Sequence, residues 1–283
     1  MSEYSHKQVA ISLSLLLEIL DALKGYGTDV IVVGGWAPYL LLKDFSKSGE
    51  EHVGSLDADL VLNYHHIPED AYETILETLR RIGYVPRTNA ADKVIPASFQ
   101  KAVQAQGAKF RMQVDFLAGE YGGTAKSHRH QRVQDLLAHK AHGADVVFDQ
   151  FYTADIEGHL PNGARVKVPA NIANEVAIFV MKGICLGQRT KAKDYYDLYM
   201  LAKHFKSGPK SIAESLAPHL QNGLVKEALA NVRQYFNSPV SLGPTSVADF
   251  IGEQNPHDRQ IRQRDVFEAL RAVLDLLNTM KGP

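Results

Sequence analysis

Two aspartates two residues apart, Asp57 and Asp59, stand in a segment whose first half alternates apolar and polar residues. The alternation over the first half of LDADLVLN, residues 56–63, predicts a half-buried strand, and side chains two residues apart on a strand point to the same face. Two neighbouring carboxylates repel each other unless a cation neutralises them, and such hard oxygen ligands suit Mg²⁺. The pair is therefore a candidate magnesium site, although an Asp-X-Asp on a strand is also common on solvated faces.

A third aspartate, Asp115, lies near the centre of a second alternating segment, KFRMQVDFLA at residues 109–118. If this strand pairs beside the first, its carboxylate joins the other two. Three carboxylates can hold two metal ions, of which one activates an attacking oxygen and the other stabilises a departing phosphate. Because aspartate is disfavoured in strands, its recurrence at these positions favours a functional reason.

A glycine pair precedes the aspartates. The β-branched run at residues 29–33 predicts a buried strand, Gly34 and Gly35 follow at once, and residues 36–43 are expected to form a helix. A strand, a glycine pair and a helix start in direct succession form a tight turn, where backbone N–H groups can meet an anion. This order, followed by the two aspartate-bearing strands, is much more restrictive than the aspartate pair alone.

The second half of the chain adds cationic and acidic candidates. Lys182 follows an apolar run, where a lysine is costly if it is buried without a partner; the alternative is a side chain that extends to solvent. Arg189 and Lys191 supply donors suited to phosphate, or else mark a solvated helix start. For Asp194, a charge that stabilises the N-terminus of the following helix explains the residue at least as well as catalysis.

These residues resemble two known signatures. The first half resembles the DNA polymerase β-like nucleotidyltransferase superfamily in Gly34-Gly35, Gly54-Ser55, Asp57-X-Asp59 and Asp115. The second half resembles the AbiEii/MenT toxin nucleotidyltransferases, the toxin halves of type IV-like toxin–antitoxin and phage-defence pairs. That likeness is carried by Lys182 and by the segment KAKDYYDLY at residues 191–199, and the whole resemblance covers roughly residues 28–205.

The resemblance implies a role for each residue. The triphosphate would be gripped by Gly34, Gly35 and Ser55. Mg²⁺ would be held by Asp57, Asp59 and Asp115. In the helical half, Lys182 would contact the nucleotide phosphates with help from Arg189 and Lys191, and Asp197 would be the acidic partner, with Asp194 as its rival. The segment between Gly35 and Asp57 is longer than the usual spacing, with residues 44–52 as the insertion.

The predicted elements favour an α/β (α+β) fold, with a nucleotidyltransferase-like mixed sheet flanked by helices and then a helical domain. The boundary is expected near Pro169, so that residues 1–169 form the catalytic domain and residues 170–283 complete the active-site cleft. Residues 239–256 carry several turn residues and are expected to form an exposed connection. Helices are expected at residues 7–24, 36–43, 69–82, 173–186, 193–206, 211–217, 224–236 and 264–280, and strands at 29–33, 56–63, 109–118 and 165–168.

Composition narrows the class of protein. With 45% hydrophobic and 22% charged residues, the 283-residue chain has the balance of a soluble globular protein, and its net charge of −1 argues against a general nucleic-acid coat. The single cysteine, Cys185, excludes an intrachain disulfide. No targeting segment or membrane span is evident, so a cytoplasmic protein without a membrane partner is expected.

Together these features predict transfer of a nucleoside monophosphate from an NTP to an acceptor hydroxyl, with Mg²⁺ as cofactor and release of pyrophosphate. By resemblance, the acceptor is a tRNA 3′ end or a protein, the chain is a toxin, and an antitoxin protein is its partner. Two alternatives stay open. One is nucleotidylation of a small molecule such as an aminoglycoside, and the other is a non-catalytic module that binds a nucleotide without releasing pyrophosphate.

Overall fold

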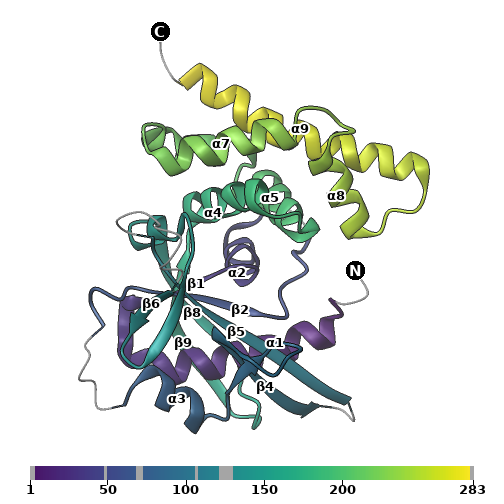
Figure 1. Ribbon diagram of the computed structural model, residues 1–283. Helices are drawn as coiled ribbons and strands as arrows, with labels where there is room; N and C mark the ends of the chain where they lie inside the picture. Colours follow the sequence, from purple (N-terminus) through teal and green to yellow (C-terminus); the bar gives the residue numbers. More distant parts are fainter. Residues whose placement is uncertain (1–3, 48–49, 68–72, 106–107, 121–129, 281–283) are drawn as a thin grey trace. The chain divides into compact units, whose positions relative to one another are not determined.

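The computed structural model describes residues 4–47, 50–67, 73–105, 108–120 and 130–280 (Figure 1). They form a mixed α/β structure in which strands dominate the first part and helices the second, which confirms the predicted fold class. The chain divides into two compact units. The sheet unit consists of Ser2–Ala37 and Val53–Ala173, and the helical unit of Pro38–His52 and Asn174–Pro283. The predicted domain boundary near Pro169 stays a prediction.

The sheet unit is built on one mixed sheet, which among the described residues has nine strands. Its main path runs in the order β3-β4-β5-β2-β1-β9-β8, while β7 pairs with β5 and β6 pairs with β7. The pairs β1–β9, β2–β5 and β5–β7 are parallel, and the other pairs are antiparallel. The strands are β1 (Val30–Val33), β2 (Ala58–Leu62), β3 (Val85–Thr88), β4 (Val94–Ala105), β5 (Ala108–Ala118), β6 (His130–Val133), β7 (Leu136–Lys140), β8 (Phe151–His159) and β9 (Arg165–Ala173).

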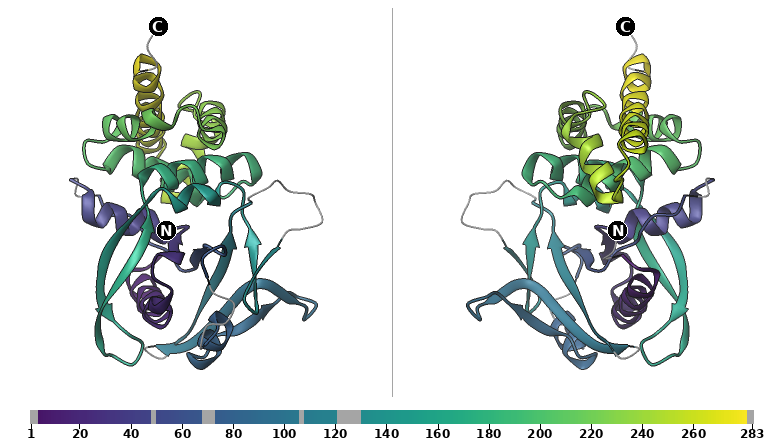
Figure 2. Two further views of the ribbon diagram at one scale, coloured as in Figure 1. Left: turned by 90° about the vertical axis from the view of Figure 1, so that its left-hand side faces the viewer. Right: turned by 90° about the vertical axis from the view of Figure 1, so that its right-hand side faces the viewer.

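Helix α1 (His6–Leu23) packs against strands β5, β8 and β9 of this sheet. Figure 2 shows the sheet curving around α1, which is seen end-on. A capping box between Ser5 and Gln8 starts the helix. The ammonium group of Lys101 on β4 donates to the carboxylate of Glu18 on α1 at 2.7 Å, which ties the helix to the sheet. This face is therefore covered.

Helix α3 (Ile75–Arg81) lies beside α1 and is shorter than expected. The predicted helix from residue 69 begins only at Ile75, because the side chain of Thr74 accepts a hydrogen bond from the Glu77 N–H and caps the N-terminus. Residues 69–72 of that prediction lie outside the described residues. Two short 3₁₀ helices, Lys24–Asp29 and Ala144–Phe148, complete the helical elements described in this unit.

The helical unit is centred on α5, whose residues from Lys193 to Ala202 are all buried. Helices α4, α6, α8 and α9 pack against it. Its tyrosines Tyr195 and Tyr199 are fully inaccessible to solvent, so they form core rather than a stacking surface. The helices are α4 (Glu175–Gln188), α5 (Ala192–His204), α6 (Pro209–Leu216), α7 (Gly223–Tyr235), α8 (Leu242–Ile251) and α9 (Pro256–Met280), with a 3₁₀ turn at Ala217–His219. Helix α2 (Trp36–Phe45) begins in the sheet unit and continues in this one.

The exposed connection predicted at residues 239–256 is wrong, because α8 occupies its centre. Ser241 precedes the helix, Pro244 lies in its first turn, and Gly252 ends it in a left-handed conformation. These turn-forming residues are therefore the start and stop signals of a short helix. Val247 and Ala248 are fully buried, and α8 packs against α5 and α9.

None of the described helices is both long enough and apolar enough to cross a membrane.

Candidate active site

One of the predicted aspartates, Asp59, lies against the glycine turn of the sheet unit. Strand β1 ends at Val33, which is the antiparallel Cα partner of Asp59 on β2. Gly34 follows with φ +63°, a conformation that favours glycine. A Cβ atom on Gly34 would overlap Oδ2 of Asp59 and would lie 2.7 Å from its Cγ. The Asp59 carboxylate thus occupies the space next to Gly34, and a side chain at residue 34 would displace it.

Asp115 stands beside Asp59. Strand β5 pairs with β2 in parallel, and Asp59 is the direct Cα partner of Asp115. The two strands are neighbours, as the sequence-based site requires, and paired residues of adjacent strands present their side chains on the same face. Both residues are partly exposed. The structure therefore brings together two of the three predicted carboxylates as cross-strand neighbours.

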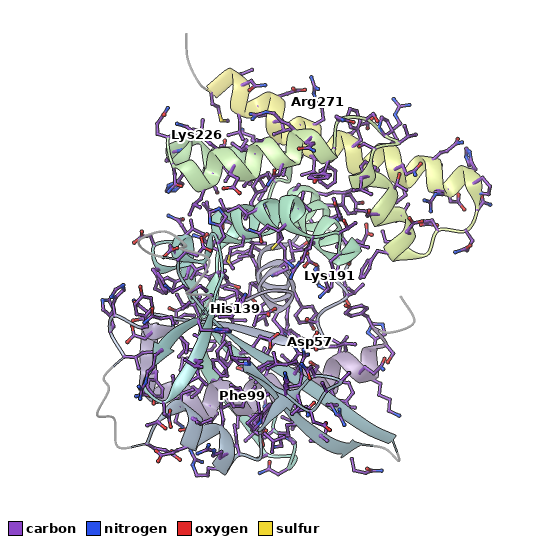
Figure 3. All side chains as sticks on the ribbon, in the orientation of Figure 1. Asp57, Phe99, His139, Lys191, Lys226 and Arg271 are labelled. Atoms are coloured by element: carbon purple, nitrogen blue, oxygen red, sulfur yellow. The ribbon has the colours of Figure 1, made fainter. Side chains whose placement is uncertain are left out.

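Asp57 lies just outside the strand. The predicted strand from Leu56 begins at Ala58 instead, and Asp57 occupies a bend directly before it, with an exposed side chain (Figure 3). Of the predicted triphosphate-binding residues, Gly35 is buried in the turn before α2, and Ser55 is buried after Gly54, which has φ +81°. Their contacts with a nucleotide stay predictions.

The donor chemistry of this site fits magnesium. In the part of the chain that the structure describes, there is no group of three or more His, Cys, Asp or Glu side chains arranged to hold a metal ion. Mg²⁺, however, is usually bound by one or two carboxylates together with water and substrate phosphates. Asp59 and Asp115 supply such a pair, and Asp57 as a third ligand stays a prediction.

A second group of predicted residues forms a buried ion cluster within the helical unit. Lys182 on α4 places Nζ 2.7 Å from Asp194 Oδ1 and 2.7 Å from Asp197 Oδ2, both on α5. Lys193 also reaches Asp197, with Nζ 2.8 Å from Oδ1. These four side chains are buried. The cost of burying Lys182 is therefore offset by two carboxylates, and the interpretation of a side chain extending to solvent is wrong.

The ammonium groups control the protonation of this cluster. Burial alone would raise the pKa of Asp197, but Lys182, Lys193 and a hydrogen bond from His52 outweigh it and hold that pKa well below its usual value. Burial lowers the pKa of Lys182, but Asp197 and Asp194 reverse this effect and leave it raised. For Lys193, burial prevails and the pKa is lowered. Asp197 and Lys182 are thus charged at neutral pH.

His52 also belongs to this cluster, and no pattern in the sequence predicted its participation. Its Nε2 lies 2.9 Å from Asp197 Oδ1, and its ring centroid lies 5.1 Å from that of Tyr196. Burial, followed by the charge of Lys193, lowers the pKa of His52 to about 4 even though Asp197 opposes the shift. The imidazole is therefore neutral at pH 7 and donates its Nε2–H to the carboxylate. His52 ends the segment expected to be an insertion.

Arg189 and Lys191 border this cluster differently. The Arg189 Nε donates to Asp194 Oδ2 at 2.9 Å, although its side chain is 54% exposed. Lys191 precedes the first turn of α5 and is exposed (Figure 3). Asp194 thus contacts the buried Lys182 and the half-exposed Arg189, whereas the cationic partners of Asp197, Lys182 and Lys193, are both buried. The predicted site residues thus fall into two groups, one in each unit, and each group is coherent within its own unit.

Comparisons with known proteins add little to this geometry. No protein-family model matches the chain, and no curated protein matches it. A similar solved structure is the crystal structure of a candidate nucleotidyltransferase from H. pylori, with 14% sequence identity over 99% of this chain and 100% of that chain. The TM-score is 0.45. At this level, the likeness carries no argument about function.

Proposed function

We propose that this chain is a magnesium-dependent nucleotidyltransferase that moves a nucleoside monophosphate from an NTP to an acceptor hydroxyl. The observation that carries the proposal is the pairing of Asp59 with Asp115 on adjacent strands, with Asp59 against the glycine turn at Gly34. A carboxylate pair beside a strand–glycine–helix turn offers a candidate metal site and a candidate anion site on the same unit.

The proposed reaction is an in-line displacement at phosphorus. The acceptor oxygen forms a bond to the α-phosphorus, the bond from that phosphorus to the oxygen bridging the β-phosphate breaks, and pyrophosphate leaves while the acceptor loses its proton. Bound Mg²⁺ would neutralise the charge that develops on the phosphate oxygens. Asp59 and Asp115 would hold it, joined by Asp57. The backbone of Gly34 and Gly35 and the side chain of Ser55 would orient the triphosphate.

The role proposed for the helical cluster is less direct. Lys182 contacts Asp194 and Asp197, so a contact with nucleotide phosphates would require it to exchange or share these partners. Asp197 has three partners of its own in Lys182, Lys193 and His52. We therefore favour Asp197 over Asp194 as the acidic partner of Lys182, and we assign both to organising the cationic groups.

The finer assignments follow from the resemblance of residues 28–205 to the AbiEii/MenT toxins. They are a tRNA 3′ end or a protein as the acceptor, a toxin role, a neighbouring antitoxin protein and a cytoplasmic location. A small hydroxylated acceptor such as an aminoglycoside is the alternative within the same chemistry. A nucleotide-binding module without catalysis is the alternative outside it.

The decisive experiment incubates the chain with each α-labelled NTP and Mg²⁺, and offers total RNA, small hydroxylated acceptors or protein as separate acceptors. Asp59→Asn should lower labelling and pyrophosphate release at least about 100-fold, because several kcal/mol of charge stabilisation depend on the bound metal. The matched control is Asp155→Asn, an exposed aspartate of β8 that should leave the rate unchanged. Undiminished labelling by Asp59→Asn overturns the assignment. NTP binding without pyrophosphate release supports the non-catalytic module.

A further inference from the structure

Two side chains, Gln113 and Arg87, form a chain of hydrogen bonds to Asp115, which we call the relay. Gln113, two residues earlier on β5, donates from Nε2 to Asp115 Oδ2 at 2.6 Å, and Arg87 on β3 donates from Nη1 to Gln113 Oε1. We propose that Arg87 acts through Gln113 to position the Asp115 carboxylate for metal binding. This inference rests on the proposed function, because it assigns two positioning residues to the same site.

The chemistry of the three groups determines the direction of the relay. A guanidinium group can only donate and an ionised carboxylate can only accept, whereas an amide does both. The amide of Gln113 therefore has one orientation that satisfies both neighbours, with its oxygen toward Arg87 and its NH₂ toward Asp115. Arg87 fixes that orientation, and the NH₂ group in turn holds Oδ2 of Asp115. Partners of this kind orient metal-binding side chains in other proteins.

The pairing of β3 with β4 is irregular at Arg87. Residue Pro86 pairs with Phe99, but Thr88 pairs with Val94, so β4 carries extra residues opposite Arg87. Within that irregular stretch, Ala97 has φ +64°, which is rare for a residue with a side chain. Bulges are frequent next to active sites, where they redirect side chains. Arg87 itself is half-buried and its Nε is inaccessible to solvent, unlike an arginine on a solvated face.

The direction in which metal affinity changes when Arg87 is replaced distinguishes positioning through Gln113 from a direct effect of the Arg87 charge. Removing the positive charge of Arg87 near a cation site would, through space alone, raise the affinity of that site for a divalent ion. The relay predicts a lower affinity, because the amide of Gln113 becomes free to turn and no longer holds Asp115. A residue that only stabilises the sheet would leave the affinity of the folded chain unchanged.

The test titrates the full chain with Mn²⁺ alone and follows free Mn²⁺ by electron paramagnetic resonance. Gln113→Leu and Arg87→Met should each weaken Mn²⁺ binding about 10-fold, a loss typical of such partners. In the Gln113→Leu background, Arg87→Met should cause no further loss, because the relay is already broken. Gln104→Leu on β4 is the matched control, since this exposed glutamine shares the sheet face at a distance from Asp115 along the strand.

The outcomes distinguish this inference from the function on which it rests. Wild-type affinity in Gln113→Leu, or an increased affinity in Arg87→Met, overturns the relay. The proposed function still stands in that case if Asp59→Asn lowers both Mn²⁺ affinity and labelling. Absence of saturable Mn²⁺ binding and of labelling in the unmodified chain overturns both. If Gln113→Leu fails to fold, Gln113→Asn keeps the amide but shortens its reach and should show the same loss.

Discussion

The carboxylate of Asp59 fills the space beside Gly34 in which any side chain at that residue would stand. Two features of the structure require glycine at this position. Its φ of +63° favours glycine, and the carboxylate from β2 leaves no room for a Cβ atom. The position of Asp59 on β2 and the identity of residue 34, in the turn after β1, are therefore coupled.

Gly34→Ala should consequently lower the rate of nucleotide labelling. The substitution adds about 1–2 kcal/mol of backbone strain and pushes the Asp59 carboxylate away from its place beside Asp115. We expect the labelling rate to fall at least about 10-fold in protein that is still folded by circular dichroism, because small displacements of a positioned group are costly to catalysis.

Gly163→Ala is the control for the strain. Gly163 also has a positive φ, +87°, but open space surrounds it where a Cβ would stand. It should lose a similar free energy of unfolding in urea and keep full labelling activity. Equal activity losses in the two variants would show that instability, and not displacement of Asp59, explains the effect at Gly34.

Local patterns in the sequence were sufficient to predict the central strands β1, β2 and β5 of the sheet. The β-branched run before Gly34 and the alternation around Asp59 and Asp115 belong to strands whose inner faces are buried, so their pattern is strong. Strands β3, β6 and β7 were not predicted. Neither were the longer strands β4 and β8. Most of their described residues are exposed or half-buried, and they carry polar residues on both sides, so the contrast on which such predictions depend is weak.

Long-range partners explain what the sequence could not provide. His52 meets Asp197 across 145 residues, and Arg87 meets Gln113 across 26. No spacing rule connects such residues, because tertiary packing alone brings them together. A buried lysine such as Lys182 does signal that a partner exists, but the sequence does not identify Asp194 and Asp197 as both being that partner.

Lys182 and Arg189 both contact Asp194, but their replacement should lower the free energy of unfolding by different amounts. Lys182→Met should lower the free energy of unfolding by about 3–5 kcal/mol, because the buried carboxylates Asp194 and Asp197 each lose a partner. Arg189→Met removes another partner of Asp194, but its side chain is 54% exposed, so the loss should be about 0–1 kcal/mol. Urea denaturation at pH 7 measures both, and equal losses would contradict the burial argument.

Labelling assays of the same variants separate stability from catalysis. If Lys182 contributes to the reaction, Lys182→Met should lose activity at temperatures well below its unfolding transition, where the protein is folded. Full activity under those conditions would assign Lys182 to structure alone.

Gly183, the neighbour of Lys182, should control the packing of α4 against α7. A Cβ at this residue would lie 2.8 Å from the Cβ of Ala228 and 3.1 Å from its backbone oxygen. Gly183→Ala should therefore cost about 1–3 kcal/mol through overpacking. Gly223→Ala at the start of α7, where the corresponding space is open, should be neutral or stabilising by up to about 1 kcal/mol. Thermal unfolding followed by circular dichroism tests the pair, and a neutral Gly183→Ala would contradict close packing of the two helices.

His52 should make the stability of the chain depend on pH between about 4 and 6.5. Its pKa is lowered to about 4 in the folded chain, chiefly by burial, so the unfolded chain binds a proton in this range that the folded chain does not. The stabilisation from its neutral form is complete above pH 6.5 and decreases as the pH falls to about 4, by up to about 3 kcal/mol.

The stabilising contribution of Asp197 changes below this pH range. Its pKa in the folded chain is held well below the usual 3.8, so the contribution is lost as the pH falls from about 3.8 through that lower value. His52→Gln keeps an N–H donor for Asp197 but cannot be protonated, so the slope of unfolding free energy between pH 4 and 6.5 should flatten. Urea titrations at pH 4.5, 5.5, 6.5 and 7.5 measure this slope, with His159→Gln on β8 as the exposed control. A wild-type slope in His52→Gln would contradict a buried neutral imidazole.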